Sequence, residues 1–255
     1  MKISFCKNSA VKDAKKPAVI IVSKDQIAKS KVKFIDFAKK NLDFDAKFGK
    51  ICTLTHEEKV IILVGSGDNK ELNSEKTQTL GAKILDYING SKIEAAEIFF
   101  GSKIDTSLKV KPKDDKDICD LAFGALLKSY RFNKYFENKL DGKKFNVKEL
   151  RISVNDVKKA QKAFAEQETL ANNVFLVRDL VSEPGNVLNP EAYADICKDL
   201  KKDGLTVEVL GEKEMAKLGM NSLLGVGQGS AFESKLVVMK WNGSKKKSEK
   251  KLSAT

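Results

Sequence analysis

The sequence is poor in the residues from which most catalytic and metal sites are built. It contains one histidine, His56, one tryptophan, and four cysteines that lie far apart and form no CxxC pair. A Ser/His/Asp triad would have to use His56, and the sequence has no GxSxG motif to present a nucleophile. Isolated cysteines give neither a metal knuckle nor a redox motif, so we expect reduced thiols that pack as small apolar side chains.

Long apolar runs are also missing. The longest are short stretches such as Ala18–Val22 and Val60–Val64, whereas a helix that crosses a bilayer needs roughly 20 apolar residues. The N-terminal MKISFCKNSA has no apolar segment of signal-peptide length. With 42% hydrophobic and 32% charged residues, the composition is that of a globular protein. These features predict a cytoplasmic protein without a membrane partner.

The positive charge is abundant but mostly scattered. The net charge is +12, nearly all from lysine, and Ser244–Lys251 alone carries five lysines and one glutamate. Elsewhere lysines alternate with acids, which is typical of a solvated surface, whereas a nucleic-acid groove combines clustered basic residues with aromatics. We expect weak, nonspecific nucleic-acid binding at most. A basic nucleic-acid-binding or subunit-docking module without catalysis stays open as an alternative function.

The first part of the chain alternates predicted strands and helices. Strands rich in Val and Ile are predicted at Lys2–Cys6, Ala18–Val22, Ile51–Leu54, Val60–Val64, Ala96–Phe100 and Asn146–Ile152. His56-Glu57-Glu58 suggests a hairpin turn, and Gly65–Asp68 is predicted to break the chain. Helical periodicity covers Leu72–Gly90 and Asp117–Leu127. This alternation is typical of a mixed α/β layer structure.

One long helix is predicted from Asp156 to Ser182. Its apolar residues form a continuous stripe over about seven turns, Ser153 with Asp156 suggests a capping box, and Pro184-Gly185 ends it. Because it lies between two strand-containing regions, we interpret it as a rigid connector. The predicted organisation is an N-terminal mixed α/β domain (1–152), a connector helix (153–184) and an incomplete α/β domain (185–255).

The C-terminal region begins with a strong helix signal at Asn189-Pro190, running to about Lys202. Predicted strands at Leu205–Val209 and Lys235–Trp241 flank a short helix, Glu212–Leu218. We interpret this order as the opening of a parallel sheet with only two strands, too few to bury both faces. The glycines of LLGVGQGS are predicted to form a tight loop before a strand, which is not the geometry of a phosphate-binding loop.

Several segments carry a family resemblance. RDLVSEPGNVLNP (178–190), LGM (218–220), LLGVGQGS (223–230) and LVVMKWNG (236–243) resemble the opening of the catalytic domain of the leucyl (cytosol) aminopeptidase family. GALL (124–127) with Tyr130, Phe132 and Tyr135 is similar to a GALL…YRFxKY stretch in that family's N-terminal domain. The resemblance is strong from Leu121 to Gly243 and weaker before it.

The resemblance implies a two-metal peptidase. In the family, two divalent ions, Mn or Zn, activate a water that attacks the N-terminal peptide bond of short peptides, and the subunits form hexamers. The family's metal ligands lie in a GKGxxFDxGG-type motif and an NTDAEGR motif, downstream of the strand that ends near Trp241. No position of this sequence matches them, nor the family's catalytic lysine and arginine. We therefore assign no catalytic, cofactor-binding or metal residue and expect this chain to be inactive alone.

A different metal site has little support in the sequence. His56 lies in a predicted turn beside Glu57 and Glu58, where a histidine is most often a solvated residue. The other candidate carboxylates, Asp43 with Asp45 and the pair Asp114-Asp115, fall in predicted loops, and nothing indicates that they converge.

Overall fold

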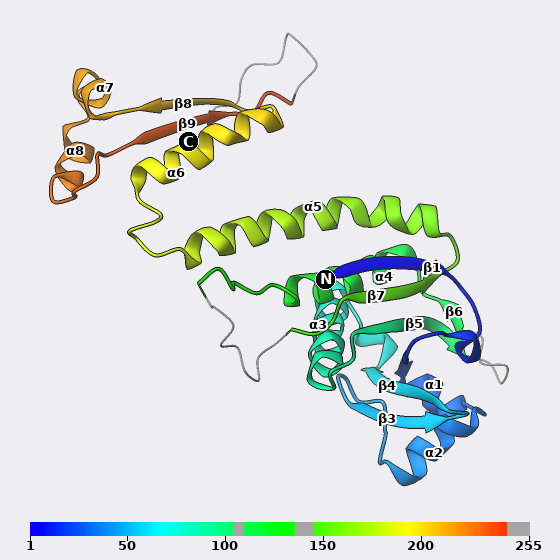
Figure 1. Cartoon of the computed structure of the whole chain (residues 1–255). Coiled ribbons are helices and arrows are strands. Elements are labelled where there is room, and N and C mark those ends of the chain that lie inside the picture. The colour runs from blue at the N-terminus through cyan, green and yellow to red at the C-terminus, as the bar shows by residue number, and fades with distance from the viewer. Residues whose placement is uncertain (105–109, 136–144, 244–255) are drawn as a thin grey trace. The chain divides into compact units, whose positions relative to one another are not determined.

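A computed structural model describes residues 1–104, 110–135 and 145–243 (Figure 1). The chain divides into two compact units, Met1–Arg178 and Asp179–Thr255, and each is considered by itself. The lysine-rich segment 244–251 lies outside the described residues. The α/β fold class is confirmed, whereas the division into 1–152, 153–184 and 185–255 stays a prediction.

The described residues of the first unit form one seven-stranded sheet. Its strand order is β1-β7-β5-β2-β4-β3, with β6 paired to β5. The antiparallel pairings are β3 with β4 and β6 with β5, and the others are parallel. The strands are β1 (Lys2–Lys7), β2 (Ala18–Ser23), β3 (Ile51–His56), β4 (Lys59–Gly67), β5 (Ala95–Ile104), β6 (Val110–Pro112) and β7 (Glu149–Val154).

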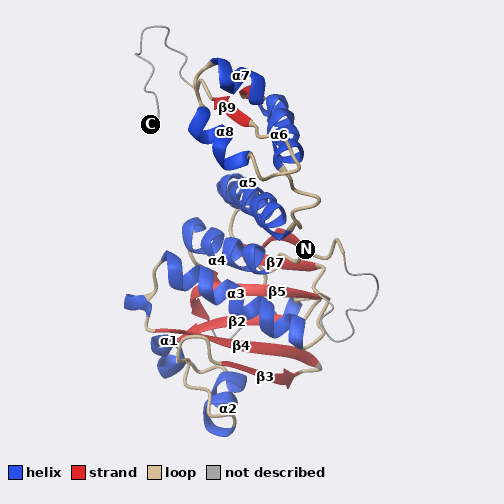
Figure 2. Cartoon of the chain, turned by 90° about the vertical axis from the view of Figure 1, so that its left-hand side faces the viewer, coloured by secondary structure: helices blue, strands red, loops and turns tan. Residues whose placement is uncertain are grey.

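Alternation along the central strands explains the two helical layers. In β2, Val19 and Ile21 belong to one buried cluster, whereas Ala18, Ile20 and Val22 belong to another. Successive side chains of a strand point to opposite faces, so a strand buried on both sides is apolar throughout. Helices α3 (Ser74–Gly90) and α4 (Asp115–Lys128) lie next to each other against the sheet (Figure 2). Their side chains contribute to the first cluster. Helices α1 (Lys24–Lys29) and α2 (Lys33–Asn41) contribute to the second.

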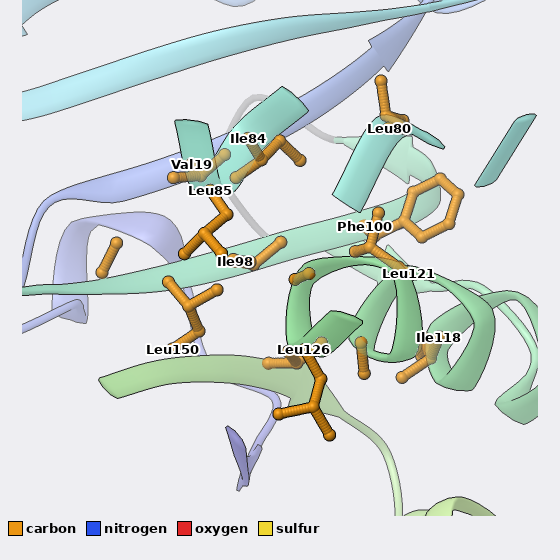
Figure 3. Packing of buried hydrophobic residues seen from close by; sticks show 14 of the residues in the cluster. Val19, Leu80, Ile84, Leu85, Ile98, Phe100, Ile118, Leu121, Leu126 and Leu150 are labelled. Atoms are coloured by element: carbon orange, nitrogen blue, oxygen red, sulfur yellow. The ribbon is translucent and has the colours of Figure 1, made fainter. Parts of the chain in front are cut away.

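The larger cluster joins the sheet to α3 and α4. Figure 3 shows Ile84 and Leu85 of α3 with Leu121 and Leu126 of α4 among side chains of the central strands. The two helices approach closely because both carry a glycine at the crossing. A Cβ added to Gly124 would lie 1.9 Å from the Gln78 carbonyl oxygen.

Two features of this unit differ from the sequence prediction. The predicted break at Gly65–Asp68 is wrong, because β4 continues to Gly67. Gly65 is a strand residue that leaves room for a neighbouring loop: a Cβ there would lie 2.1 Å from the Lys47 carbonyl oxygen. Helices α1 and α2 have no counterpart in the sequence prediction. Helix α1 begins with a capping box between Ser23 and Gln26.

The long helix is confirmed as one continuous element, α5 (Val157–Ser182), 26 residues long. Its predicted capping box is wrong: Ser153 lies buried in β7 and donates its hydroxyl to Asn8, 2.9 Å away. The carboxylate of Asp156 instead accepts the Lys159 amide, 3.0 Å away, at the start of the helix.

The apolar stripe of α5 is also divided more than the periodicity suggested. Ala160, Phe164 and Ala171 are buried in the first unit. Leu170 and Val177, counted in the same stripe, are 54% and 57% exposed. The buried face of α5 is therefore narrower than the apolar stripe.

The second unit contains α6 (Pro190–Asp199), β8 (Thr206–Leu210), α7 (Glu212–Lys217), α8 (Asn221–Gly227) and β9 (Leu236–Lys240). Asn189 caps α6 as predicted, accepting the Ala192 amide at 3.0 Å. The predicted parallel sheet is wrong, because β8 and β9 pair antiparallel. Both α7 and α8 lie at one end of the pair, so the chain returns beside β8 without a crossover (Figure 1).

No helix within the described ranges combines the length and apolar character required to span a bilayer.

Candidate functional site

His56 lies where the sequence placed it, at the β3–β4 hairpin. The turn residues Glu57 and Glu58 have φ values of 46° and 62°, the left-handed conformation of tight hairpin turns. The His56 Nε2 atom is 3.9 Å from Glu57 Oε1, and its ring lies 5.3 Å from that of Phe34. This environment gives the histidine a packing contact and one distant carboxylate, not a ligand set.

The candidate carboxylates Asp43 and Asp45 form ion pairs with lysines that are close in sequence. Asp45 lies 2.8 Å from Lys47 Nζ, and hydrogen bonds from Lys47 lower the pKa of this carboxyl to about 2. Asp43 lies 3.0 Å from Lys50 Nζ, and its hydrogen bond raises the pKa of that lysine.

The pair Asp114-Asp115 also makes structural contacts, at the start of α4. Asp114 caps the helix by accepting the Asp117 amide at 2.9 Å, and Asp115 lies 2.7 Å from Lys159 Nζ. A carboxylate at a helix N-terminus stabilises the helix.

The structure brings no metal site together in the part of the chain that it describes. Within those residues, no three His, Cys, Asp or Glu side chains are grouped so that they could hold a metal ion. The predicted glycine loop is wrong as well, because Gly225 and Gly227 belong to α8. Gly227 lies against Ser234, whose Oγ would be 1.9 Å from an added Cβ.

Two buried carboxylates were not singled out from the sequence. Glu97 on β5 is 5% exposed and accepts the Cys6 thiol at 3.6 Å. Burial, with the nearby charge of Glu97, raises the pKa of Cys6 to about 11. The thiol therefore stays protonated at neutral pH and is a poor nucleophile.

The second buried carboxylate joins three helices. Asp120 on α4 is 4% exposed, and its Oδ1 accepts Nε2 of Gln78 on α3 at 3.1 Å and Nε2 of Gln167 on α5 at 3.3 Å. The other Asp120 oxygen and Gln167 Oε1 have no hydrogen-bond partner among the described residues. Apolar periodicity finds helix faces, but it does not indicate which polar residues will lie between them.

An open groove of about 420 Å³ lies beside these helices in the first unit. Its polar lining comes from Gln78 and Thr79 of α3, Lys128 at the end of α4, Tyr130, Arg131, and Arg178 of α5. Arg178 donates from Nη1 to the Leu127 carbonyl oxygen at 2.9 Å, and its guanidinium lies 5.5 Å from the Tyr130 ring. Two segments that the sequence analysis selected separately, 124–135 and 178–190, therefore meet at Arg178.

Comparison with protein families gives two matches that belong together. The profile described as "Cytosol aminopeptidase family, N-terminal domain" matches residues 13–139. The profile described as "Cytosol aminopeptidase family, catalytic domain" matches residues 175–254.

Curated relatives agree with these matches. A probable cytosol aminopeptidase of Wolbachia pipientis wMel is 38% identical over 216 residues, which are 83% of this chain and 40% of the relative. One from Caulobacter vibrioides is 40% identical over 188 residues, 74% of this chain and 36% of the relative. The chain thus spans about two fifths of the length of these relatives.

Solved structures share the fold. The bottromycin maturation enzyme BotP, in complex with Mn, aligns with a TM-score of 0.69 at 20% identity, covering 90% of this chain and 46% of that one. A mutant of tomato leucine aminopeptidase aligns with a TM-score of 0.67 at 19% identity, covering 86% and 46%.

Proposed function

Because this chain belongs to the cytosol aminopeptidase family, we propose that it is the N-terminal portion of a leucyl aminopeptidase and does not hydrolyse peptides by itself. The observation that carries the proposal is the pair of matches, to the family's N-terminal domain at 13–139 and to part of its catalytic domain at 175–254. The complete enzyme would remove N-terminal residues from short peptides.

The residues described in the structure do not fit the family's pair of metal ions. When bound, two Mn or Zn ions would polarise the scissile carbonyl and activate a water. Such a site needs several converging anionic ligands, and the described residues group no three candidate side chains. The Mn complex of BotP supports a divalent metal for a complete enzyme of this fold. We assign no reaction step to the residues of this chain.

The proposal also covers the location, assembly and substrates of the complete enzyme. We expect the complete enzyme to act in the cytoplasm as a homohexamer on short peptides. Size-exclusion chromatography with light scattering would measure whether this chain assembles alone. A subunit of 28.2 kDa gives well-separated masses for monomer and hexamer.

Activity is tested with the purified chain. We expect no release of product from leucine amide or leucyl-p-nitroanilide, with or without added Mn or Zn. The Caulobacter relative, assayed in parallel, is the positive control. Metal-dependent turnover that elutes with this polypeptide, and is removed with it by an affinity tag, would contradict the proposal.

The assignment to a longer enzyme has its own test. The nucleotide sequence that follows the codon for Thr255, read in all frames, is expected to encode a GKGxxFDxGG-type motif. A following sequence without that motif in any frame would favour a module that works without catalysis.

A further inference from the structure

The groove beside α3 and α4 is rich in cationic side chains, and the proposed peptidase function assigns no role to them. Three cationic side chains line it: Lys128, Arg131 and Arg178. Lys128 lies 2.9 Å from the carboxylate of Asp86, so its charge is partly compensated. The two arginines decide what the groove can bind.

Both guanidinium groups are held in place by main-chain oxygens. Arg131 donates from Nη1 to the carbonyl oxygens of Lys128 at 2.9 Å and Tyr130 at 2.6 Å, and it lies 5.0 Å from the Phe145 ring. Arg178 uses its own Nη1 for Leu127. A guanidinium has five N–H donors, so each keeps several for another partner.

Neither guanidinium is neutralised within the described part of the molecule. Among those residues, no carboxylate comes within 4.0 Å of Arg131 or Arg178. Their contacts are neutral carbonyl oxygens and aromatic rings, which orient an arginine without cancelling its charge.

We propose that this groove is a binding site for an oxyanion, a carboxylate or a phosphate, held by Arg131 and Arg178. Planar guanidinium groups match both anions by paired N–H···O bonds, and pre-orientation by Leu127, Lys128 and Tyr130 lowers the entropic cost of forming them. Thr79 in the groove wall adds a hydroxyl, whereas the side-chain amide of Gln78 already donates to Asp120. The site lies in the first unit and does not depend on peptidase activity.

The test titrates the whole purified chain with two probes at constant ionic strength set by sodium chloride. One probe is inorganic phosphate, and the other is triglycine compared with triglycine amide. Calorimetry and the melting temperature report binding, since a ligand that binds only the native state raises the apparent stability in a saturable way. We expect saturable binding of at least one oxyanion. Binding of triglycine but not its amide would identify a peptide carboxylate, and binding of phosphate alone would identify a phosphate group.

Variants separate the site from general charge. Arg131→Gln removes an exposed guanidinium and is expected to weaken binding at least tenfold without changing the melting temperature of the free protein. Lys39→Gln removes one positive charge at an exposed position of α2 and serves as the matched control, with binding unchanged. No saturable binding by either probe, or equal weakening in both variants, would overturn the proposal.

Discussion

The two units of the chain solve the problem of burying apolar surface to different extents. The first unit places two apolar clusters on the two faces of one sheet and covers each with helices. In the described part of the second unit, four hydrophobic side chains are buried: Ala194, Cys197, Val207 and Met215. Many larger ones remain exposed there, among them Leu218 at 61%, Val226 at 86% and Trp241 at 68%.

The difference shows how much a fold depends on its number of layers. Burial of apolar area contributes roughly 25 cal/mol per Å², and fixing the backbone costs about 1–2 kcal/mol per residue. A two-stranded sheet beside one helix buries little area for each residue that it orders. Large exposed apolar side chains are typical of surfaces that contact something else. We therefore expect the second unit to be much the less stable of the two.

Limited proteolysis should show the largest difference between the two units. With trypsin at low ratio, we expect cleavage throughout the region after Gly185 while residues 1–178 survive as a core. Exposed chain with few buried contacts opens locally and is cut first. Mass spectrometry of the fragments over time measures this. Equal resistance of the second unit would show that its small core is sufficient.

Truncation of a core side chain of α5 is the next largest effect. Phe164 is 3% exposed and makes an edge-to-face contact with Phe5, with ring centres 5.7 Å apart. Phe164→Ala should lower the free energy of unfolding of the first unit by about 3–5 kcal/mol, because it leaves a cavity. Denaturant unfolding monitored by circular dichroism measures the change.

A substitution of Lys159 is the matched control for Phe164→Ala. It tests whether an ion pair contributes to the packing of α5 in the first unit. Lys159 of the same helix is paired with Asp115, 2.7 Å away, but it is largely exposed to water. Exposed ion pairs contribute little because water and salt screen them. Lys159→Ala should leave the unfolding midpoint unchanged within error. A loss comparable to that of Phe164→Ala would mean that charge, not packing, anchors the helix.

Glycines within helices have different surroundings in the two units. A Cβ at Gly124 would meet the Gln78 carbonyl at 1.9 Å, whereas one at Gly225 of α8 would meet nothing within 4 Å. Gly124→Ala should therefore destabilise the first unit by about 3 kcal/mol, the upper part of the usual overpacking range. Gly225→Ala is expected to be neutral or slightly stabilising, since alanine favours a helix. Thermal melts of both variants provide the measurement, and a tolerated Gly124→Ala would contradict the close helix crossing.

The features that were predicted correctly are those that depend on residues close together in the sequence. Helix α5 and strand β2 were found because a long apolar period or an unbroken apolar run needs no knowledge of distant residues. The direction of β9 was wrong because pairing direction depends on the path of the connection, which α7 and α8 determine. Ser153 was assigned to a cap because the motif fits, but the register of β7 buries it beside Asn8.

The candidate groove could not be predicted from local sequence patterns either, because it depends on contacts between distant segments. Arg131 and Arg178 both lie in segments that the family resemblance selected, yet 47 positions separate them. Only the packing of α5 beside α4 brings their side chains to one groove. Asp120, Gln78 and Gln167 were likewise out of reach, because a buried polar contact among three helices leaves no periodic trace.

The smallest expected effect is a difference between two cysteines that are equally buried. Cys119 in the first unit and Cys197 in the second are each 3% exposed, so neither reacts with a thiol reagent without some opening of the structure. Burial, helped by the charges of Asp115 and Asp120, raises the pKa of Cys119 to about 11, so the closed structure keeps this thiol protonated at pH 8 and labelling depends on opening. We expect iodoacetamide at pH 8 to label Cys197 at least tenfold faster than Cys119, equivalent to about 1.4 kcal/mol. Peptide mass spectrometry over a time course measures both rates in one sample, and the same experiment in denaturant should make them converge. If Cys119 is labelled as fast as Cys197 in the native protein, the two units open with similar ease, and the contrast in their stability does not follow from burial.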